Sequence, residues 1–181
     1  FIGLGLHVFS SYFYSLPFLV FSSAVLADQM PEMILFSVIL GSVGLVDDFN
    51  QSLGPRLRLT LLLLITSCGF LIFPNFLPNN LPINIGCEAL DHPSIILIAS
   101  TVFMIGFVNA GNIVDGANGL LALIAVCFFG LVFLESGNVD YLILMLAITV
   151  FAGVNTIWGQ IHLGDFGAYW LSALIVLTAF K

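Results

Sequence analysis

Residues 109–120 read Asn-Ala-Gly-Asn-Ile-Val-Asp-Gly-Ala-Asn-Gly-Leu and lie between two long apolar segments. In an α-helix, side chains three positions apart fall on one slowly turning face, so the polar residues of this stretch form a single stripe. The glycines beside the stripe leave room for a ligand or another backbone to approach closely. An alternative is a polar seam between packed membrane helices, but four polar side chains at strict spacing favour a functional site. The stripe consists of Asn109, Asn112, Asp115 and Asn118.

The composition indicates a membrane protein. Of the 181 residues, 60% are hydrophobic and 7% are charged, whereas a soluble domain has roughly 25% charged residues. The apolar segments approach the roughly 20 residues that cross a bilayer as a helix, and they are continuous rather than alternating as in membrane strands. We therefore predict an all-α, polytopic integral membrane protein with about seven transmembrane helices in the lipid bilayer. Nucleic acid is not a credible partner for such a chain, whose net charge is -7.

The apolar segments are expected to form one transmembrane helical domain over residues 1–181. Because each crossing changes the side of the membrane, the connectors after the second, fourth and sixth segments face one compartment. These connectors hold Asp47 and Asp48, the polar stripe, and Asp165. Carboxylates at membrane depth are costly and are usually functional, so we predict one shared site. The expected spans are residues 1–26, 33–46, 57–73, 94–108, 120–134, 141–158 and 168–180.

Arg56 and Arg58 lie on the same predicted face as these acidic residues. Positive residues accumulate on the cytoplasmic side of membrane proteins, so this face is expected to be cytoplasmic. Several carboxylates among amides at one water interface suit a hard cation such as Mg²⁺, which binds a few carboxylate oxygens together with water and substrate phosphates. The histidines and cysteines lack the spacing of a zinc site.

Three motifs together resemble a known family. Residues 44–48 read Gly-Leu-Val-Asp-Asp and are followed by Arg56, residues 109–120 carry the polar stripe, and residues 164–169 read Gly-Asp-Phe-Gly-Ala-Tyr. In order and spacing these motifs resemble the polyprenyl-phosphate N-acetylhexosamine-1-phosphate transferases of glycosyltransferase family 4. Within that family they look most like the WecA-like branch, rather than the branch that acts on the muramoyl-pentapeptide nucleotide.

The resemblance implies transfer of N-acetylhexosamine 1-phosphate, expected as GlcNAc 1-phosphate, from a UDP-N-acetylhexosamine to undecaprenyl phosphate with release of UMP. This reaction is the first membrane step of O-antigen lipopolysaccharide or related cell-envelope polysaccharide synthesis. The resemblance also implies Mg²⁺, with Mn²⁺ as a substitute, because phosphoryl transfer needs positioning and charge neutralisation. The expected location is the bacterial inner membrane with the site on the cytoplasmic face, and a homodimer is a further expectation.

The motif match assigns roles to individual residues. Asp165 and Asp47 correspond to metal ligands, and Asp47 is also placed with Asp48 and Asp115 among the catalytic acids. Whether one of these aspartates acts as a nucleophile or as a base is left open. The positions that correspond to substrate binding are Asn109, Asn112, Asn118 and Arg56.

The chain departs from the family pattern at Gln51, where many members carry a charged residue, at Asn118, where other branches carry Asp, and at Phe166, where the family has a small residue. The family's first span and its His-containing loop near the C-terminus are expected to be absent, so the chain would be a fragment incomplete at both ends. Two alternatives stay open. One is a non-catalytic relative that retains the scaffold, and the other is an ion-coupled transporter, although transporters place such residues near the bilayer midplane.

Overall fold

The computed structural model describes residues 31–50, 54–79, 92–115, 119–158 and 163–181. These ranges form α-helices and one short 3-10 helix and contain no strand, which confirms the predicted all-α class. The elements are α2 (Pro31–Asn50), α3 (Pro55–Ile72), η1 (Pro74–Phe76), α4 (Pro93–Asp115), α5 (Leu120–Ser136), α6 (Val139–Trp158) and α7 (Gly164–Ala179). Among them, α3, α4 and α6 are long and apolar enough to cross a membrane.

The helices correspond to six of the expected spans, and the remaining span, residues 1–26, lies outside the described residues. The helix ends differ from the expectation. Helix α2 continues through Asp47 and Asp48, α4 continues through Asp115, and α7 already contains Asp165, so assigning these acids to connectors was wrong. Hydropathy marks only the apolar part of a helix, whereas backbone hydrogen bonding continues into the water interface, where polar side chains are tolerated.

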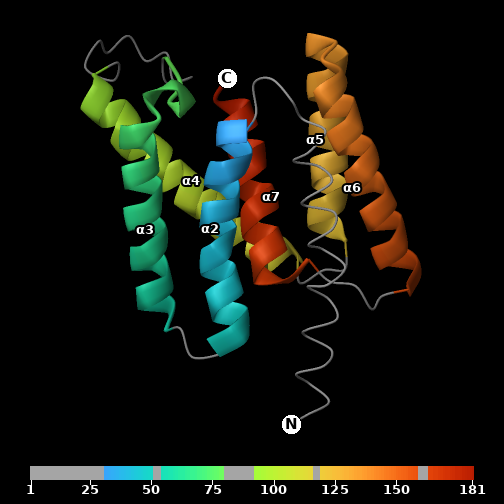
Figure 1. Cartoon of the computed structure of the whole chain (residues 1–181), viewed down its shortest axis with the longest axis horizontal. Coiled ribbons are helices and arrows are strands. Elements are labelled where there is room, and N and C mark those ends of the chain that lie inside the picture. Colours follow the sequence, from blue (N-terminus) through green and yellow to red (C-terminus); the bar gives the residue numbers. More distant parts are fainter. Residues whose placement is uncertain (1–30, 51–53, 80–91, 116–118, 159–162) are drawn as a thin grey trace.

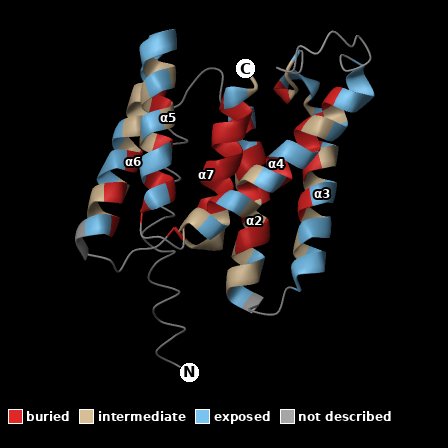
Figure 2. Cartoon of the chain, turned by 180° about the vertical axis from the view of Figure 1, so that it is seen from behind, coloured by how far each residue is buried: buried red, intermediate tan, exposed pale blue. Residues whose placement is uncertain are grey.

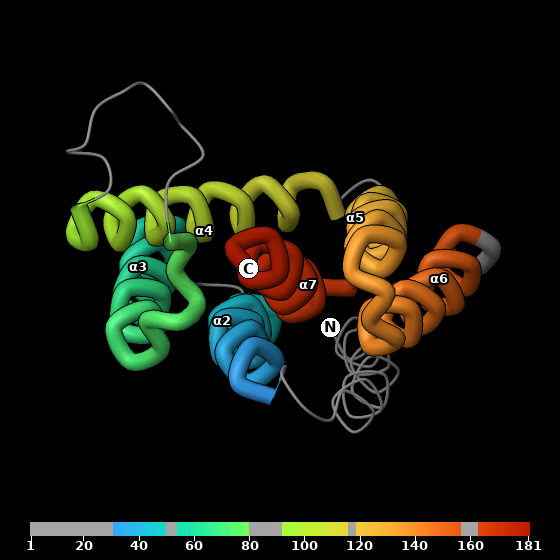
Figure 3. Tube along the Cα trace, turned by 90° about the horizontal axis from the view of Figure 1, so that it is seen from above, coloured from blue at the N-terminus to red at the C-terminus, as the bar shows by residue number. Residues whose placement is uncertain are grey.

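Helix α7 is the central element of the bundle. It packs against α2, α4 and α5, and Figure 3 shows it enclosed between α2 and α4. Every residue from Phe166 to Thr178 is buried, as the colouring of α7 in Figure 2 shows. A helix that is apolar on all sides either faces lipid or is buried among other helices, and α7 is buried among α2, α4 and α5. The surrounding helices therefore fix the start of α7, where Asp165 lies.

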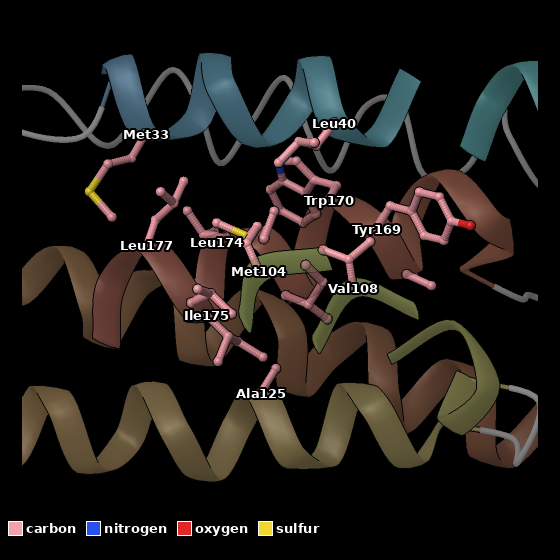
Figure 4. Packing of buried hydrophobic residues seen from close by; sticks show 14 of the residues in the cluster. Met33, Leu40, Met104, Val108, Ala125, Tyr169, Trp170, Leu174, Ile175 and Leu177 are labelled. Carbon is pink, nitrogen blue, oxygen red and sulfur yellow. The ribbon is translucent and has the colours of Figure 1, made fainter. Parts of the chain in front are cut away.

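Large side chains fill the space between α7 and its neighbours. Figure 4 shows Leu40 of α2, Met104 and Val108 of α4, and Trp170 of α7 in one buried cluster, each at most 2% exposed. Between helices in a membrane, close packing of this kind supplies much of the attraction, because lipid tails are as apolar as the side chains. The cluster holds α2, α4 and α7 in a fixed relation.

Two glycines allow α7 to approach its neighbours closely. A methyl group at Gly44 of α2 would overlap the backbone carbonyl of Asp165, and a methyl group at Gly111 of α4 would overlap the hydroxyl of Ser172. Small residues at such contacts let the backbones of membrane helices come together. The last turns of α2 therefore lie directly against the first turn of α7.

The helix ends that carry the predicted site lie at one end of the bundle. Figure 1 shows the end of α2, the end of α4 and the start of α7 at the lower end of the molecule, whereas the α5 to α6 connection and the C-terminus lie at the upper end. This arrangement confirms that the three polar stretches share one end of the bundle.

Candidate active site

An ion-paired cluster joins the ends of three helices. Arg58, in the first turn of α3, places its Nη1 atom 2.8 Å from Oδ2 of Asp47 on α2 and 3.7 Å from Oδ2 of Asp165 on α7. The short connection between α2 and α3 brings Arg58 back beside the end of α2. The carboxylates of Asp47 and Asp165 also contact each other. The structure thus brings together the two residues that the sequence suggested as metal ligands.

The side chain of Asp48 accepts hydrogen bonds from the backbone at the start of α7. Its Oδ2 accepts a hydrogen bond from the backbone N–H of Phe166 at 3.3 Å, and the N–H of Asp165 is a further donor to this carboxylate. The first N–H groups of a helix have no partner within the helix, and the positive end of the helix dipole attracts an anion there. Asp48 therefore caps α7 from α2, and the close approach at Gly44 makes this contact geometrically feasible.

The Phe166 side chain points along α2 rather than toward solvent. A methyl group at Gly41 would lie 3.1 Å from the Phe166 ring, and Phe166 is 8% exposed. Gly41 precedes Asp48 by nearly two helical turns. The large residue at this position is thus accommodated by a glycine on the neighbouring helix.

Part of the polar stripe meets the acidic cluster. Asn109, Asn112 and Asp115 all lie on α4, as the three-residue spacing predicted, and the side chain of Asn112 hydrogen-bonds to Asp165. Asn109 donates instead to the carbonyl of Ile105 in its own helix at 2.8 Å. Asp115 is half-buried in the last turn of α4. The predicted position Asn118 lies outside the described residues.

The arginine that reaches the acids is Arg58, whereas the motif match gives a substrate-binding role to Arg56. Arg56 is exposed, and within the described ranges its side chain has no ion pair. Two residues advance about 200° around a helix, so the two arginines point to nearly opposite sides of α3. The sequence places both arginines on the same membrane face as the acids, but which of them reaches the acids depends on the orientation of α3.

Burial and mutual repulsion raise the pKa values of two cluster acids, both at helix ends outside the three candidate membrane spans. Burial and the charge of Asp165 raise the pKa of Asp48 to about 6, against the lowering effect of its backbone hydrogen bonds. Burial, followed by the neighbouring Asp47, raises the pKa of Asp165, although Arg58 and Asn112 act in the opposite direction. The guanidinium of Arg58 pairs with Asp47 and Asp165 and leaves part of the negative charge of the cluster uncompensated, which favours binding of a cation.

Two buried polar side chains had no role assigned from the sequence. Tyr169 is fully buried on α7, and its hydroxyl has no hydrogen-bond partner in the described part of the chain, although it lies within electrostatic range of Arg58 and the cluster acids. Asn155 on α6 is 1% exposed and lies near Gly119, which has a φ of 78°. The available signal was a polar group within an apolar segment, which is usually functional in membrane proteins.

The geometry fits a family already suggested by the motifs. The model of the family described as Glycosyl transferase family 4 matches residues 30–181. The chain belongs to this family. Among its curated relatives is the phospho-N-acetylmuramoyl-pentapeptide-transferase of Streptococcus pneumoniae strain CGSP14, which is 30% identical over 159 residues, covering 79% of this chain and 48% of the relative. The enzyme of the same name from serotype 19F strain G54 is 29% identical over 174 residues, covering 86% of this chain and 52% of the relative.

The chain spans about half the length of these curated relatives. No solved structure matches it. The family match confirms the resemblance to glycosyltransferase family 4 and supports a transferase in the membrane. The match does not specify the WecA-like branch, and the relatives above carry the name of the muramoyl-pentapeptide branch, so the branch remains a prediction.

The donor set suits Mg²⁺ better than a metal that needs a full protein cage. Among the described residues, no group of three or more His, Cys, Asp or Glu side chains is arranged to hold a metal. Mg²⁺ usually binds through one or two carboxylates and completes its shell with water and substrate phosphates. The Asp47 and Asp165 carboxylates, in contact and backed by the Asn112 amide, provide such a pair.

Proposed function

We propose that this chain carries the catalytic site of a Mg²⁺-dependent transferase that moves N-acetylhexosamine 1-phosphate from a UDP-sugar to undecaprenyl phosphate. The observation that carries the proposal is the cluster of Asp47, Asp48 and Asp165 at one end of an apolar helical bundle in a member of this family. A lipid acceptor requires a site at a membrane face, because its phosphate must reach water while its tail stays in the bilayer.

The net reaction exchanges one phosphoanhydride for another. An oxygen of the lipid phosphate forms a bond to the phosphorus that carries the sugar, and the bond from that phosphorus to the bridging oxygen breaks. UMP leaves with the bridging oxygen and its electron pair, and the sugar phosphate remains on the lipid. A bound Mg²⁺ would neutralise the phosphate charges during this exchange.

The described residues suggest how the chain serves this reaction. In this proposal Asp47 and Asp165 hold the cation, and Asn112 orients Asp165 through its hydrogen bond. Asp48 fixes the first turn of α7, and so the position of Asp165, through the helix backbone. Asp115, one helical turn beyond Asn112, lies at the end of α4 that faces the same cluster. We assign it with Asn109 and the predicted position Asn118 to the nucleotide-sugar side, whereas Arg56 points away from the acids.

The finer assignment is GlcNAc 1-phosphate transfer at the cytoplasmic face of a bacterial inner membrane, as the first step of O-antigen or a related envelope polysaccharide. The test uses the full chain in lipid nanodiscs with undecaprenyl phosphate and a panel of UDP-sugars. UMP should form only when both substrates are present, and EDTA should stop its release. UMP release with the muramoyl-pentapeptide nucleotide alone among the donors would assign the other branch. Uptake of a solute into vesicles without UMP release would favour a transporter.

A further inference from the structure

Arg58 carries the positive charge that lies beside the carboxylates of Asp47 and Asp165 in this structure. Its guanidinium lies 2.8 Å from the carboxylate of Asp47 and 3.7 Å from that of Asp165, and the two carboxylates contact each other. Two ionised carboxylates in contact repel each other unless a positive charge lies beside them. Arg58 therefore performs the neutralising role that the proposed function gives to a divalent cation.

The Arg58 side chain lies at the rim of the cluster. It is 27% exposed and Asp165 is 29% exposed, whereas Asp47 is 14% exposed and more enclosed. An arginine side chain is long and flexible, and its planar group of N–H donors binds phosphate as well as carboxylate. Arg58 can therefore leave the acids for a phosphate oxygen without any movement of a helix.

One buried polar group close to the cluster, the hydroxyl of Tyr169, makes no hydrogen bond with the described residues. Tyr169 follows Asp165 by four residues, on the same face of α7. Figure 4 shows this hydroxyl pointing away from the buried cluster that contains Trp170. A buried hydroxyl without a partner destabilises a fold, so its presence calls for an explanation.

We propose that Arg58 and a divalent cation exchange places at the Asp47 and Asp165 carboxylates, and that the Tyr169 hydroxyl donates to one of these carboxylates after Arg58 has left. The inference rests on the proposed function, because it takes this pair as the cation site. It goes further in making Arg58 a competitor of the metal and Tyr169 a donor used only in the metal-bound arrangement. After the exchange, the guanidinium is available to a phosphate group.

The competing interpretation is a permanent ion pair, in which Arg58 holds the acids in place for the metal. The two interpretations predict opposite effects of removing the guanidinium. Under exchange, Arg58→Gln removes a competitor and the cation binds more tightly. Under a permanent ion pair, the carboxylates lose their orientation and the cation binds more weakly.

The experiment measures binding of Mn²⁺ alone, without substrates, to the full chain in lipid nanodiscs, with free Mn²⁺ counted by electron paramagnetic resonance. Arg58→Gln is expected to bind Mn²⁺ roughly 5- to 150-fold more tightly than the unmodified chain, the usual range of coupling between linked binding events. The matched control is Arg56→Gln, which removes the same charge from the exposed side of α3. It should change the affinity by less than about twofold at 0.15 M salt, because exposed charges are screened.

Tyr169→Phe tests the second half of the proposal. Without metal, its unfolding temperature should equal or exceed that of the unmodified chain, because an unpaired buried hydroxyl has been removed. With Mn²⁺, its affinity should fall by roughly 5- to 10-fold, because the donor used in the metal-bound arrangement is lost. A tyrosine with a purely structural role predicts the reverse, namely lower stability without metal and unchanged affinity.

The inference is overturned if Arg58→Gln binds Mn²⁺ no more tightly than Arg56→Gln, or if the unmodified chain binds no Mn²⁺. Arg58→Lys provides a second test, since it retains the charge but loses the planar group, and its affinity should lie between the unmodified chain and Arg58→Gln. The proposed function fails separately, through the absence of UMP release. Tighter metal binding without UMP release supports the exchange and contradicts the transferase, and UMP release without tighter binding does the opposite.

Discussion

At the scale of single residues, neighbouring acids at the end of α2 have different tasks. Asp47 faces Arg58 and Asp165, whereas Asp48 accepts hydrogen bonds from the first turn of α7. Adjacent residues on a helix are separated by about 100°, which sends their side chains to different neighbours. The acidic doublet therefore contributes Asp47 to the carboxylate pair that would hold the cation, and Asp48 to fixing the position of α7.

The capping role of Asp48 predicts a difference between two substitutions. Asp48→Ala removes the acceptor for the exposed N–H groups of α7 and should lower the free energy of unfolding by about 1 kcal/mol, as loss of a helix cap does. Asp48→Asn retains an acceptor oxygen and should lower the free energy of unfolding by only a few tenths of a kcal/mol. Thermal unfolding of both variants in the same nanodiscs measures the difference. Equal loss in the two variants would show that the charge matters and the hydrogen bonds do not.

At the scale of elements, the contact between α2 and α7 determines the site. Gly44 allows the backbone of α2 to touch the first turn of α7, and this contact brings Asp47 and Asp48 to Asp165. Because α7 is buried on all sides, moving it to accommodate a larger residue on α2 would disturb its contacts with the other helices. The geometry of the acids thus depends on a residue that has no side chain.

A methyl group at Gly44 should separate these helices. Gly44→Ala overlaps the Asp165 backbone and is expected to destabilise the fold by about 1–3 kcal/mol, as overpacking does. It should also reduce UMP release at least tenfold, because the carboxylates of Asp47 and Asp165 are moved apart. The control is Gly106→Ala on α4, where a methyl group meets open space and helix propensity should make the change neutral or stabilising. Unfolding temperatures and UMP release are measured for both variants, and similar behaviour of the two would contradict a close contact at Gly44.

Much of the fold follows from the sequence, because hydropathy and the alternation of sides place the polar stretches at one end of a helical bundle. The spacing of Asn109, Asn112 and Asp115 also predicts their place on one helix. The sequence did not reveal that α7 is central, since hydropathy does not distinguish an apolar helix that faces lipid from one that other helices surround. It did not separate Arg58 from Arg56, because that choice depends on how α3 is rotated against α2.

At the scale of the whole molecule, the two ends of the bundle differ in their chemistry. The end that holds the acids is shown at the bottom of Figure 1, and the opposite end carries the turn between α5 and α6 near Asn138. Both ends of the bundle should meet water if its helices cross the bilayer. A site for a soluble nucleotide-sugar and a lipid phosphate belongs at one such end.

Cysteine labelling tests this arrangement. In a background with Cys68, Cys87 and Cys127 replaced by Ser, single cysteines at Gly54 and Leu120 should react with a membrane-impermeant maleimide from the same side of the membrane. A cysteine at Asn138 should react only from the other side, because α5 separates it from Leu120. The expected side for Gly54 and Leu120 is cytoplasmic. Labelling of these two positions from opposite sides would remove the shared site.

The most direct test of the central claim is the turnover of Asp165→Asn across a Mg²⁺ titration, with UMP release as the measure. Asn retains the shape of the side chain and its hydrogen bond acceptor but lacks the charge that a hard cation requires. If Asp165 holds the cation, UMP release should fall by at least about a hundredfold, and added Mg²⁺ should restore only part of it. Membrane insertion should be unchanged, since loss of a charge does not hinder a helix in lipid. Near-normal turnover of Asp165→Asn at low Mg²⁺ would contradict the assignment of this cluster as the catalytic cation site.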